Sequence, residues 1–422
     1  MTQAESIYRE LLSLTVYRNT LRQPVTGALL SLYRAAASRD EEAVCAGWGM
    51  LCAQLAERDG FPSLPSAVAA EVLADENAFV TRLIAGRLRV TGRGVDPAVP
   101  EELAGLAVRD LRVLYRAASA DPACLLDCVD PVLAGSLPRW GTAPAPAPLD
   151  RPWDACLEAL REYHRQNGCG CFTAHRAFLW RDGAMLPVEH PDPIRLSNLK
   201  GYEYQRRIAV DNTRAFLDGF EANNMLLYGD RGTGKSSTVK ALLNEYAGQG
   251  LRMIEMPKEY LRQLPDLTGH LSKVPMKFIV FIDDLSFSDG DDSFAALKAV
   301  LEGGLASRPA NVVIYATSNR RHLLRETFSA REGDEVHRAD TVQEAASLSD
   351  RFGLTLTFLM PDKQRFLDIV EQLAADRGLK ADRRALLDAA ERWALERGAR
   401  SPRYARQFIA DAQARLSRGE PL

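Results

Sequence analysis

The stretch Gly229-Asp230-Arg231-Gly232-Thr233-Gly234-Lys235-Ser236 fits the pattern G-x-x-x-x-G-K-[ST] of a phosphate-binding loop. The apolar run Met225 to Tyr228 comes before it, and a helical run starts at Ser237. Glycines allow backbone N–H groups to wrap a phosphate, and the helix that follows points its positive end at the anion. A chance glycine-rich turn does not require this order of strand, loop and helix. We therefore expect residues Gly229 to Ser237 to bind the phosphates of a nucleotide.

Two residues of this loop and two later acids make up a predicted magnesium and water site. Lys235 is expected to bridge the β- and γ-phosphates of ATP, and the Ser236 hydroxyl to bind Mg²⁺. The apolar run Phe278 to Ile282 ends in Asp283 and Asp284. We expect Asp283 to hold Mg²⁺ and Asp284 to orient or deprotonate the attacking water. Glutamate is common at the second acid, and the shorter aspartate predicts slow hydrolysis; an Asp pair that only caps a turn is the alternative.

A further apolar run, Val312 to Ala316, ends in Thr317, Ser318 and Asn319. Its last side chains should emerge beside the γ-phosphate, because the carboxyl ends of parallel strands meet at one edge of a sheet. Asn319 is the main candidate for polarising the attacking water. Thr317 and Ser318 are weaker candidates for the same role.

Two arginines are candidates for sensing the γ-phosphate. Arg351 comes just before the last predicted strand and is expected to serve a neighbouring subunit's nucleotide as an arginine finger. A structural ion pair with Asp350 is the alternative. Arg403, in the C-terminal helical part, is expected to reach the γ-phosphate of its own chain, and Arg400 and Arg406 compete for that role.

Changes in residue pattern divide the chain into four segments. Residues 1–140 show apolar residues at helical spacing and predict an all-helical domain. Residues 141–152 contain alternating Ala and Pro, which favours an extended spacer. Residues 153–362 predict an α/β nucleotide-binding domain that starts with a helix and a hairpin. Residues 363–422 return to helical spacing and predict a small lid.

Short apolar runs alternate with helical segments in the α/β part, which predicts a parallel five-strand sheet. A hairpin is expected around Phe178 to Trp180, with Asp182-Gly183 as its turn. The five runs are Met225 to Tyr228, Leu251 to Met256, Phe278 to Ile282, Val312 to Ala316 and Leu354 to Phe358.

The composition is that of a globular protein, with 46% hydrophobic and 26% charged residues in 422 and a formal net charge of −3. We expect no membrane span and a cytoplasmic location, because no long apolar run or secretory signal is present. The 7 cysteines lie in the first half, which favours reduced thiols. Cys169 and Cys171, with His164 and His175 nearby, are too closely spaced to favour a zinc site.

Taken together, the loop, the double-Asp strand, the polar-tipped strand and the lid arginine resemble the AAA+ superfamily. More narrowly, the sequence over about residues 170 to 415 resembles a bacterial AAA-type ATP-binding family known as domain of unknown function 815. The superfamily resemblance implies a sheet in the order 5-1-4-3-2, a helical lid, and ATP bound between them with Ile194 to Tyr202 around adenine. The segments that carry the narrower resemblance are Leu199 to Glu203, Asn224 to Ser237, Ala316 to His322 and Leu348 to Leu354.

The leading functional hypothesis is an oligomeric ATPase that rearranges a macromolecular partner, more readily a protein than DNA. A nucleotide-gated binding module with negligible turnover is the second hypothesis. A DNA-associated loader is the third, based on the double Asp and the Arg-rich stretch Arg392 to Arg406. A small-molecule kinase is the least favoured. The charged segment Phe328 to Ala346 is either a partner loop or a surface insertion.

Overall fold

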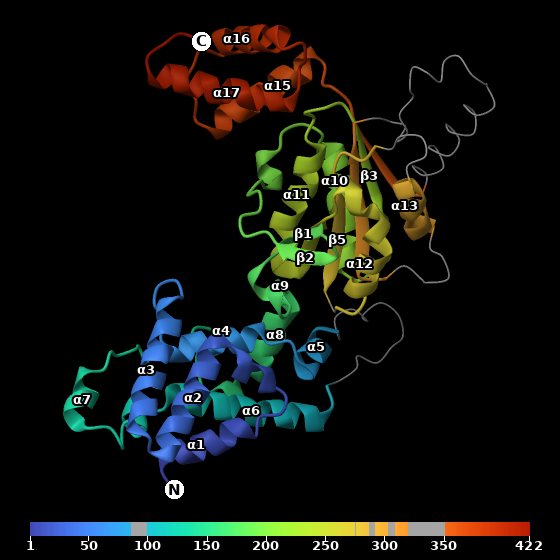
Figure 1. Ribbon diagram of the computed structural model, residues 1–422. Helices are drawn as coiled ribbons and strands as arrows, with labels where there is room; N and C mark the ends of the chain where they lie inside the picture. The colour runs from blue at the N-terminus through green and yellow to red at the C-terminus, as the bar shows by residue number, and fades with distance from the viewer. Residues whose placement is uncertain (86–98, 275, 287–291, 303–308, 320–350) are drawn as a thin grey trace. The chain divides into compact units, whose positions relative to one another are not determined.

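The computed structural model describes residues 1–85, 99–274, 276–286, 292–302, 309–319 and 351–422. It divides into two compact units, Met1–Ala174 and His175–Leu422 (Figure 1). The segment Phe328 to Ala346 and the residues just before Arg351 lie outside the described ranges. No helix within those ranges is both long and apolar enough to cross a membrane.

The first unit is built from helices, as the sequence predicted. Their amphipathic faces close around a core that includes Tyr17, Leu29, Tyr33 and Leu114. Several helices begin with a side-chain cap; the Asp40 carboxylate, for example, accepts from Ala43 N–H at the start of α3. The helices are α1 (Gln3–Leu12), α2 (Pro24–Ser38), α3 (Glu41–Ala56), α4 (Leu64–Ala74), α5 (Ala78–Ala85), α6 (Glu101–Ser119), α7 (Pro131–Ser136), α8 (Leu157–Asn167) and α9 (Cys171–Ala174).

The end of the first unit lies further along the chain than the predicted spacer at residues 141–152. That segment lies against the helices: the Ser63 hydroxyl donates to Ala143 O at 2.7 Å, and Leu149 is buried. Beyond it, Gly170 N–H donates to Ala74 O at 2.9 Å. Helix α8 and the Ala-Pro segment therefore belong to the helical unit, since their contacts are with it.

The second unit contains a seven-stranded sheet in the order β2-β1-β4-β5-β6-β3-β7. All neighbouring strands are parallel except the hairpin pair β1 and β2. The five predicted strands are β3 to β7, and they follow the order 5-1-4-3-2; the predicted hairpin extends the sheet beyond β4. The strands are β1 (Ala177–Arg181), β2 (Ala184–Pro187), β3 (Met225–Gly229), β4 (Leu251–Glu255), β5 (Lys277–Ile282), β6 (Val312–Ser318) and β7 (Leu354–Phe358).

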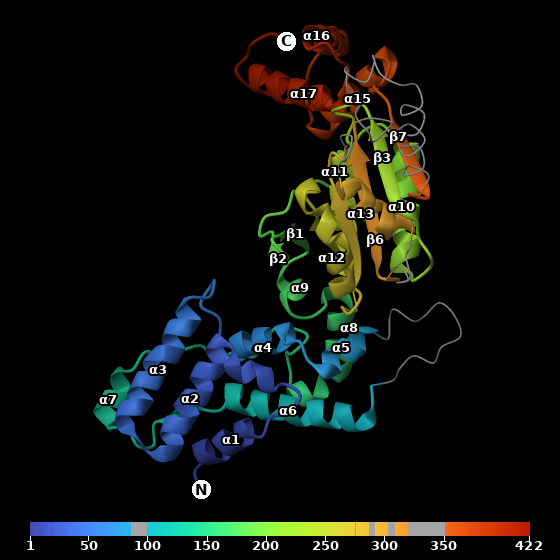
Figure 2. The ribbon, with the colours of Figure 1, turned by 45° about the vertical axis from the view of Figure 1, so that its right-hand side comes forward.

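Helices cover the sheet, and Figure 1 shows α11 and α13 on opposite sides of it. Alternate residues of the strands, among them Leu227 and Phe281, pack with α10 and α11 in one core. A separate core around Phe366, Val370 and Phe408 holds the C-terminal helices together, and Figure 2 shows these helices from a second side. The helices are α10 (Glu203–Leu217), α11 (Lys235–Tyr246), α12 (Leu264–Leu271), α13 (Asp292–Glu302), α15 (Lys363–Asp376), α16 (Arg383–Glu396) and α17 (Pro402–Ser417).

Candidate functional site

A cavity of about 630 Å³ lies within the second unit, at the carboxyl ends of its parallel strands. This is the edge at which open α/β sheets bind ligands. The lid contributes Pro402, Arg403 and Arg406 to its lining. The predicted loop contributes the residues from Arg231 to Ser237. The cavity thus joins the loop, the strand ends and the lid.

The loop follows β3 directly and turns sharply because its glycines adopt positive φ angles. Gly229 has φ of 134°, and a Cβ atom at this position would lie 2.1 Å from Phe358 O. Gly234, with φ of 100°, caps the start of α11. No residue with a Cβ atom fits at position 229, because the backbone of β7 occupies the space. The sequence order of strand, loop and helix therefore gives the expected local structure.

The Lys235 side chain lies under the loop and is buried. Its Nζ donates to Gly229 O at 2.8 Å, to Asp230 O at 2.7 Å and to Asn319 Oδ1 at 3.1 Å. Burial lowers the pKa of Lys235, and the nearby carboxylates oppose that shift. The acceptors of the ammonium group are thus three neutral oxygens, and a bound phosphate would supply a negatively charged oxygen as a further acceptor.

The strand-end acids take part in a network of short hydrogen bonds. Asp283 Oδ1 accepts from the Ser236 hydroxyl at 2.6 Å and from the Thr317 hydroxyl at 2.5 Å. Asp284 Oδ1 accepts from Asn319 Nδ2 at 2.6 Å. Asn319 also accepts from Lys235, so the site residues form two hydrogen-bonded groups on the wall of the cavity, Lys235–Asn319–Asp284 and Ser236–Asp283–Thr317. The backbone N–H of Asp284 joins the two groups by donating to Thr317 Oγ1 at 3.0 Å.

The donor set of this wall fits Mg²⁺ and a polyphosphate. A hydroxyl and a carboxylate converge at Ser236 and Asp283, and hard oxygen ligands of this kind are those that Mg²⁺ prefers. The N-terminus of α11 and the Lys235 ammonium supply the positive charge that phosphate oxygens require.

The three lid arginines lie in different surroundings. Arg403 lines the cavity, and its backbone N–H donates to Gly232 O at 3.2 Å. Arg406 also lines the cavity. Arg400 instead pairs with Glu391 at 2.5 Å, and this hydrogen bond lowers the pKa of the Glu391 carboxyl. Of the three competing residues, Arg400 therefore belongs to the internal structure of the lid.

Arg351 and two loop residues fall outside the lining of the cavity. Arg351 lies half-buried in the turn before β7 and is not among the lining residues of the described chain. Gly229 and Asp230 are also absent from that lining. Apart from Gly229, Asp230 and Arg351, the predicted site residues therefore line one cavity.

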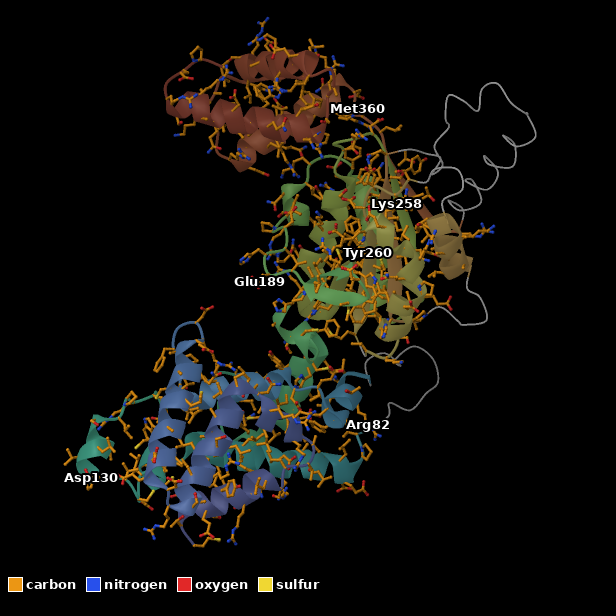
Figure 3. The ribbon with its side chains drawn as sticks, viewed as in Figure 1. Arg82, Asp130, Glu189, Lys258, Tyr260 and Met360 are labelled. Carbon is orange, nitrogen blue, oxygen red and sulfur yellow. The ribbon has the colours of Figure 1, made fainter. Side chains whose placement is uncertain are left out.

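The Asp230 side chain is directed to the segment that joins the sheet to the lid. Its Oδ2 accepts from Met360 N–H at 2.5 Å, between β7 and α15, where Figure 3 labels Met360. The Tyr202 hydroxyl donates to Leu359 O, the preceding residue, at 2.6 Å. The segment between β7 and α15 is therefore hydrogen-bonded both to the loop, through Asp230, and to Tyr202 in the lining of the cavity.

Several lining residues were not predicted from sequence. Of the segment Ile194 to Tyr202, expected around adenine, the cavity is lined by its last four residues, from Leu199 on. Arg206 and Phe358 line the cavity as well, and the Phe358 ring lies 5.0 Å from that of Tyr202. One indication in the sequence that Phe358 would line the cavity was its position at the end of a predicted strand.

Three features define the AAA+ form of the P-loop fold, and the second unit has all three. They are a parallel sheet in the order 5-1-4-3-2, a loop of the phosphate-binding pattern after β3, and a helical lid beside that loop. The chain belongs to the family described as "Protein of unknown function (DUF815)", whose sequence profile matches residues 173–416. The match covers the second unit and leaves nearly all of the helical first unit outside it.

Solved structures similar to this chain include the Thermotoga maritima RuvB Holliday junction branch migration motor. It matches with 16% identity and a TM-score of 0.38, covering 54% of this chain and 66% of that one. Two mutants of the same protein match with 15% identity and a TM-score of 0.37, covering 54% and 67%. This chain thus spans just under two thirds of the RuvB motor. The likeness is too distant to transfer a function, and the fold assignment depends on the strand order and the loop.

Proposed function

We propose that this chain is an ATP hydrolase that uses ATP binding and hydrolysis to rearrange a macromolecular partner, a protein rather than DNA. The observation that carries the proposal is that Lys235, Ser236, Asp283, Asp284 and Asn319 all line one cavity, in two hydrogen-bonded groups that Thr317 joins. A structural role alone would not require these side chains to converge at the carboxyl edge of the sheet beside a lid.

The loop and Lys235 bind the phosphates in this proposal. Lys235 exchanges its bonds to the neutral carbonyls of Gly229 and Asp230 for bonds to phosphate oxygens, in which both partners are charged. The N–H groups of the loop and the N-terminus of α11 stabilise the remaining negative charge of the phosphates. Leu199 to Tyr202 contact the base from the opposite wall.

The two acids and Asn319 act on the attacking water. Ser236 and Asp283 hold Mg²⁺, which neutralises charge that develops on the phosphate oxygens. Asp284 accepts a hydrogen bond from the water and orients it, while Asn319 fixes the Asp284 carboxylate through the 2.6 Å bond. Arg403 reaches the γ-phosphate from the lid of the same chain.

Homo-oligomerisation accounts for Arg351. Arg351 is not among the described residues that line the cavity of its own chain. We therefore assign it to the site of a neighbouring subunit, where a guanidinium stabilises transition-state charge.

Phosphate release with Mg²⁺-ATP, measured across a series of protein concentrations, tests this proposal. We expect activity per subunit to rise with concentration in the wild type and to be lost in Lys235→Ala, Asp284→Asn and Arg351→Ala. Arg384→Ala removes an exposed lid arginine and serves as the control. ATP binding without turnover in the wild type would instead support a nucleotide-gated binding module.

A further inference from the structure

The hydroxyl of Thr317 lies within hydrogen-bond distance of both strand-end acids. Thr317 is the sixth residue of β6 and only 2% of it is exposed. Its Oγ1 donates to Asp283 Oδ1 at 2.5 Å and accepts from Asp284 N–H at 3.0 Å. A hydroxyl has one donor and two acceptor lone pairs, so one group can make both bonds at once. Thr317 is thereby connected to the side chain of one acid and the backbone of the other.

The backbone of Asp284 needs such support because its φ angle is 50°, in the left-handed region. That conformation is unfavourable for residues other than glycine, although aspartate tolerates it better than most. Two consecutive N–H groups of the turn donate to Thr317: Asp284 N–H to its side chain, and Leu285 N–H to its carbonyl at 2.7 Å. Only the first of these bonds depends on the identity of residue 317.

The left-handed turn sets the direction in which the Asp284 side chain leaves the strand. In this conformation its carboxylate meets Asn319 Nδ2, and through Asn319 it is connected to Lys235. A change of Asp284 to an ordinary extended or helical conformation would move the carboxylate away from Asn319. A misplacement of about 1 Å can reduce a rate by about 100-fold.

We infer that Thr317 is a positioning residue for ATP hydrolysis, which fixes the left-handed turn at Asp284 and so aims its carboxylate at the water site. This inference rests on the proposed function. It differs from the direct contact with the attacking water that the sequence pattern suggested as a weaker possibility for Thr317. Both bonds of its hydroxyl are made within the turn, and it acts through Asp284.

The test compares Thr317→Val, which keeps the shape and removes the hydroxyl, with Thr317→Ser, which keeps the hydroxyl and removes a methyl group. We expect the valine variant to bind ATP within about 3-fold of the wild-type Kd and to lose about 10- to 100-fold in kcat. The serine variant should retain kcat within about 3-fold. A valine variant with wild-type kcat, or one that loses affinity and kcat in equal measure, would overturn the inference.

Amide hydrogen exchange at Asp284 and Leu285, followed by NMR, gives a readout that does not depend on turnover. We expect faster exchange at Asp284 in the valine variant, slow exchange at Leu285 in both variants, and wild-type exchange at Asp284 in the serine variant. Unchanged exchange at Asp284 in the valine variant would overturn the inference. If the wild type released no phosphate, the proposed function would fail while this comparison still decided the role of Thr317. Thr317→Ala replaces the valine variant if the latter does not fold.

Discussion

Glu71 in the helical unit and Asp283 in the α/β unit are both carboxylates held by several hydrogen bonds; backbone N–H groups are among the donors to Glu71, whereas hydroxyls donate to Asp283. Glu71, 5% exposed, accepts from Val25 N–H and Thr26 N–H, each at 2.9 Å, at the start of α2. It also accepts from the Thr26 hydroxyl and the Arg58 guanidinium, each at 2.6 Å. Asp283 accepts from the hydroxyls of Ser236 and Thr317. Backbone donors at a helix start are fixed, whereas a hydroxyl can rotate and become an acceptor.

This difference separates carboxylates that serve the fold from those available to a ligand. Glu71 caps α2 from another helix, since the N-cap residue Gln23 makes no side-chain cap. Asp110, fully buried, does the same for the turn at Val16 and Tyr17. At Asp283 a bound cation can replace the hydroxyl protons without breaking any backbone hydrogen bond. The same chemical group thus has a structural role in one unit and, in the proposed function, a ligand-binding role in the other.

The largest expected effect is that of Asp284→Asn on turnover. We expect kcat for phosphate release to fall by about 10³-fold, equivalent to about 4 kcal/mol, because the group that orients the water loses its charge. The free energy of unfolding should change by less than about 0.5 kcal/mol, since Asp284 is exposed. Asp266→Asn on the exposed face of α12 is the control. A large loss of stability in Asp284→Asn would show that Asp284 has a structural role, as Glu71 does, and would contradict the contrast between the two units.

Glu71→Ala should have the opposite profile. We expect the unfolding free energy of the helical unit to fall by about 3 kcal/mol, because two helix N–H groups and the Arg58 guanidinium lose a buried acceptor. Urea unfolding followed by tryptophan fluorescence measures this change, with exposed Glu57→Ala as the control. The kcat of folded protein should stay at the wild-type value, and a fall in kcat would contradict a purely structural role.

Asp230→Ala tests a carboxylate that lies between these two cases. Loss of its bond to Met360 N–H should cost about 1.5 kcal/mol of local stability and speed amide exchange in the β7–α15 connection about 10-fold. Asp230→Asn keeps an acceptor oxygen and should exchange as the wild type does. Hydrogen exchange followed by mass spectrometry makes the measurement, and equal exchange in the alanine and asparagine variants would show that the bond contributes nothing.

The smallest expected effect is a pH dependence in the helical unit. Burial lowers the pKa of His164, so the folded unit keeps it neutral while the unfolded chain takes up a proton below about pH 6.5. The stability contribution is therefore complete above that pH and is lost as the pH falls. We expect a loss of about 1 kcal/mol between about pH 7.5 and about pH 5.5 that is absent in His164→Gln. Urea unfolding at both pH values checks it, and identical pH dependence in the two proteins would exclude His164 as the cause.

The parts of the second unit that are local in sequence were predictable. The strands are short apolar runs, and the loop carries its own pattern of glycine and lysine, so both are determined by a few adjacent residues. Sequence also predicted the hairpin, because Asp182-Gly183 forms its turn. The strand order came from the family resemblance and agrees with the structure.

Features that depend on contacts between distant segments were not predictable. The bond from Met360 to Asp230 and the bond from Asp284 to Thr317 join segments with no shared pattern. The Ala-Pro segment has the composition of a spacer, yet the contacts of Ser63 and Leu149 place it in the helical unit. The pairing of Arg400 with Glu391 likewise required the packing of α16 against α17.

The hairpin at the edge of the sheet also affects how copies of the chain can associate. Without it, β4 would present an edge strand of buried residues, able to pair with a strand of another molecule. Strand β1 instead pairs with β4, and the outermost strand is β2, whose four residues end in Pro187, which has no N–H to donate. At this edge a short strand that ends in proline leaves few backbone N–H groups for a strand of another molecule to pair with.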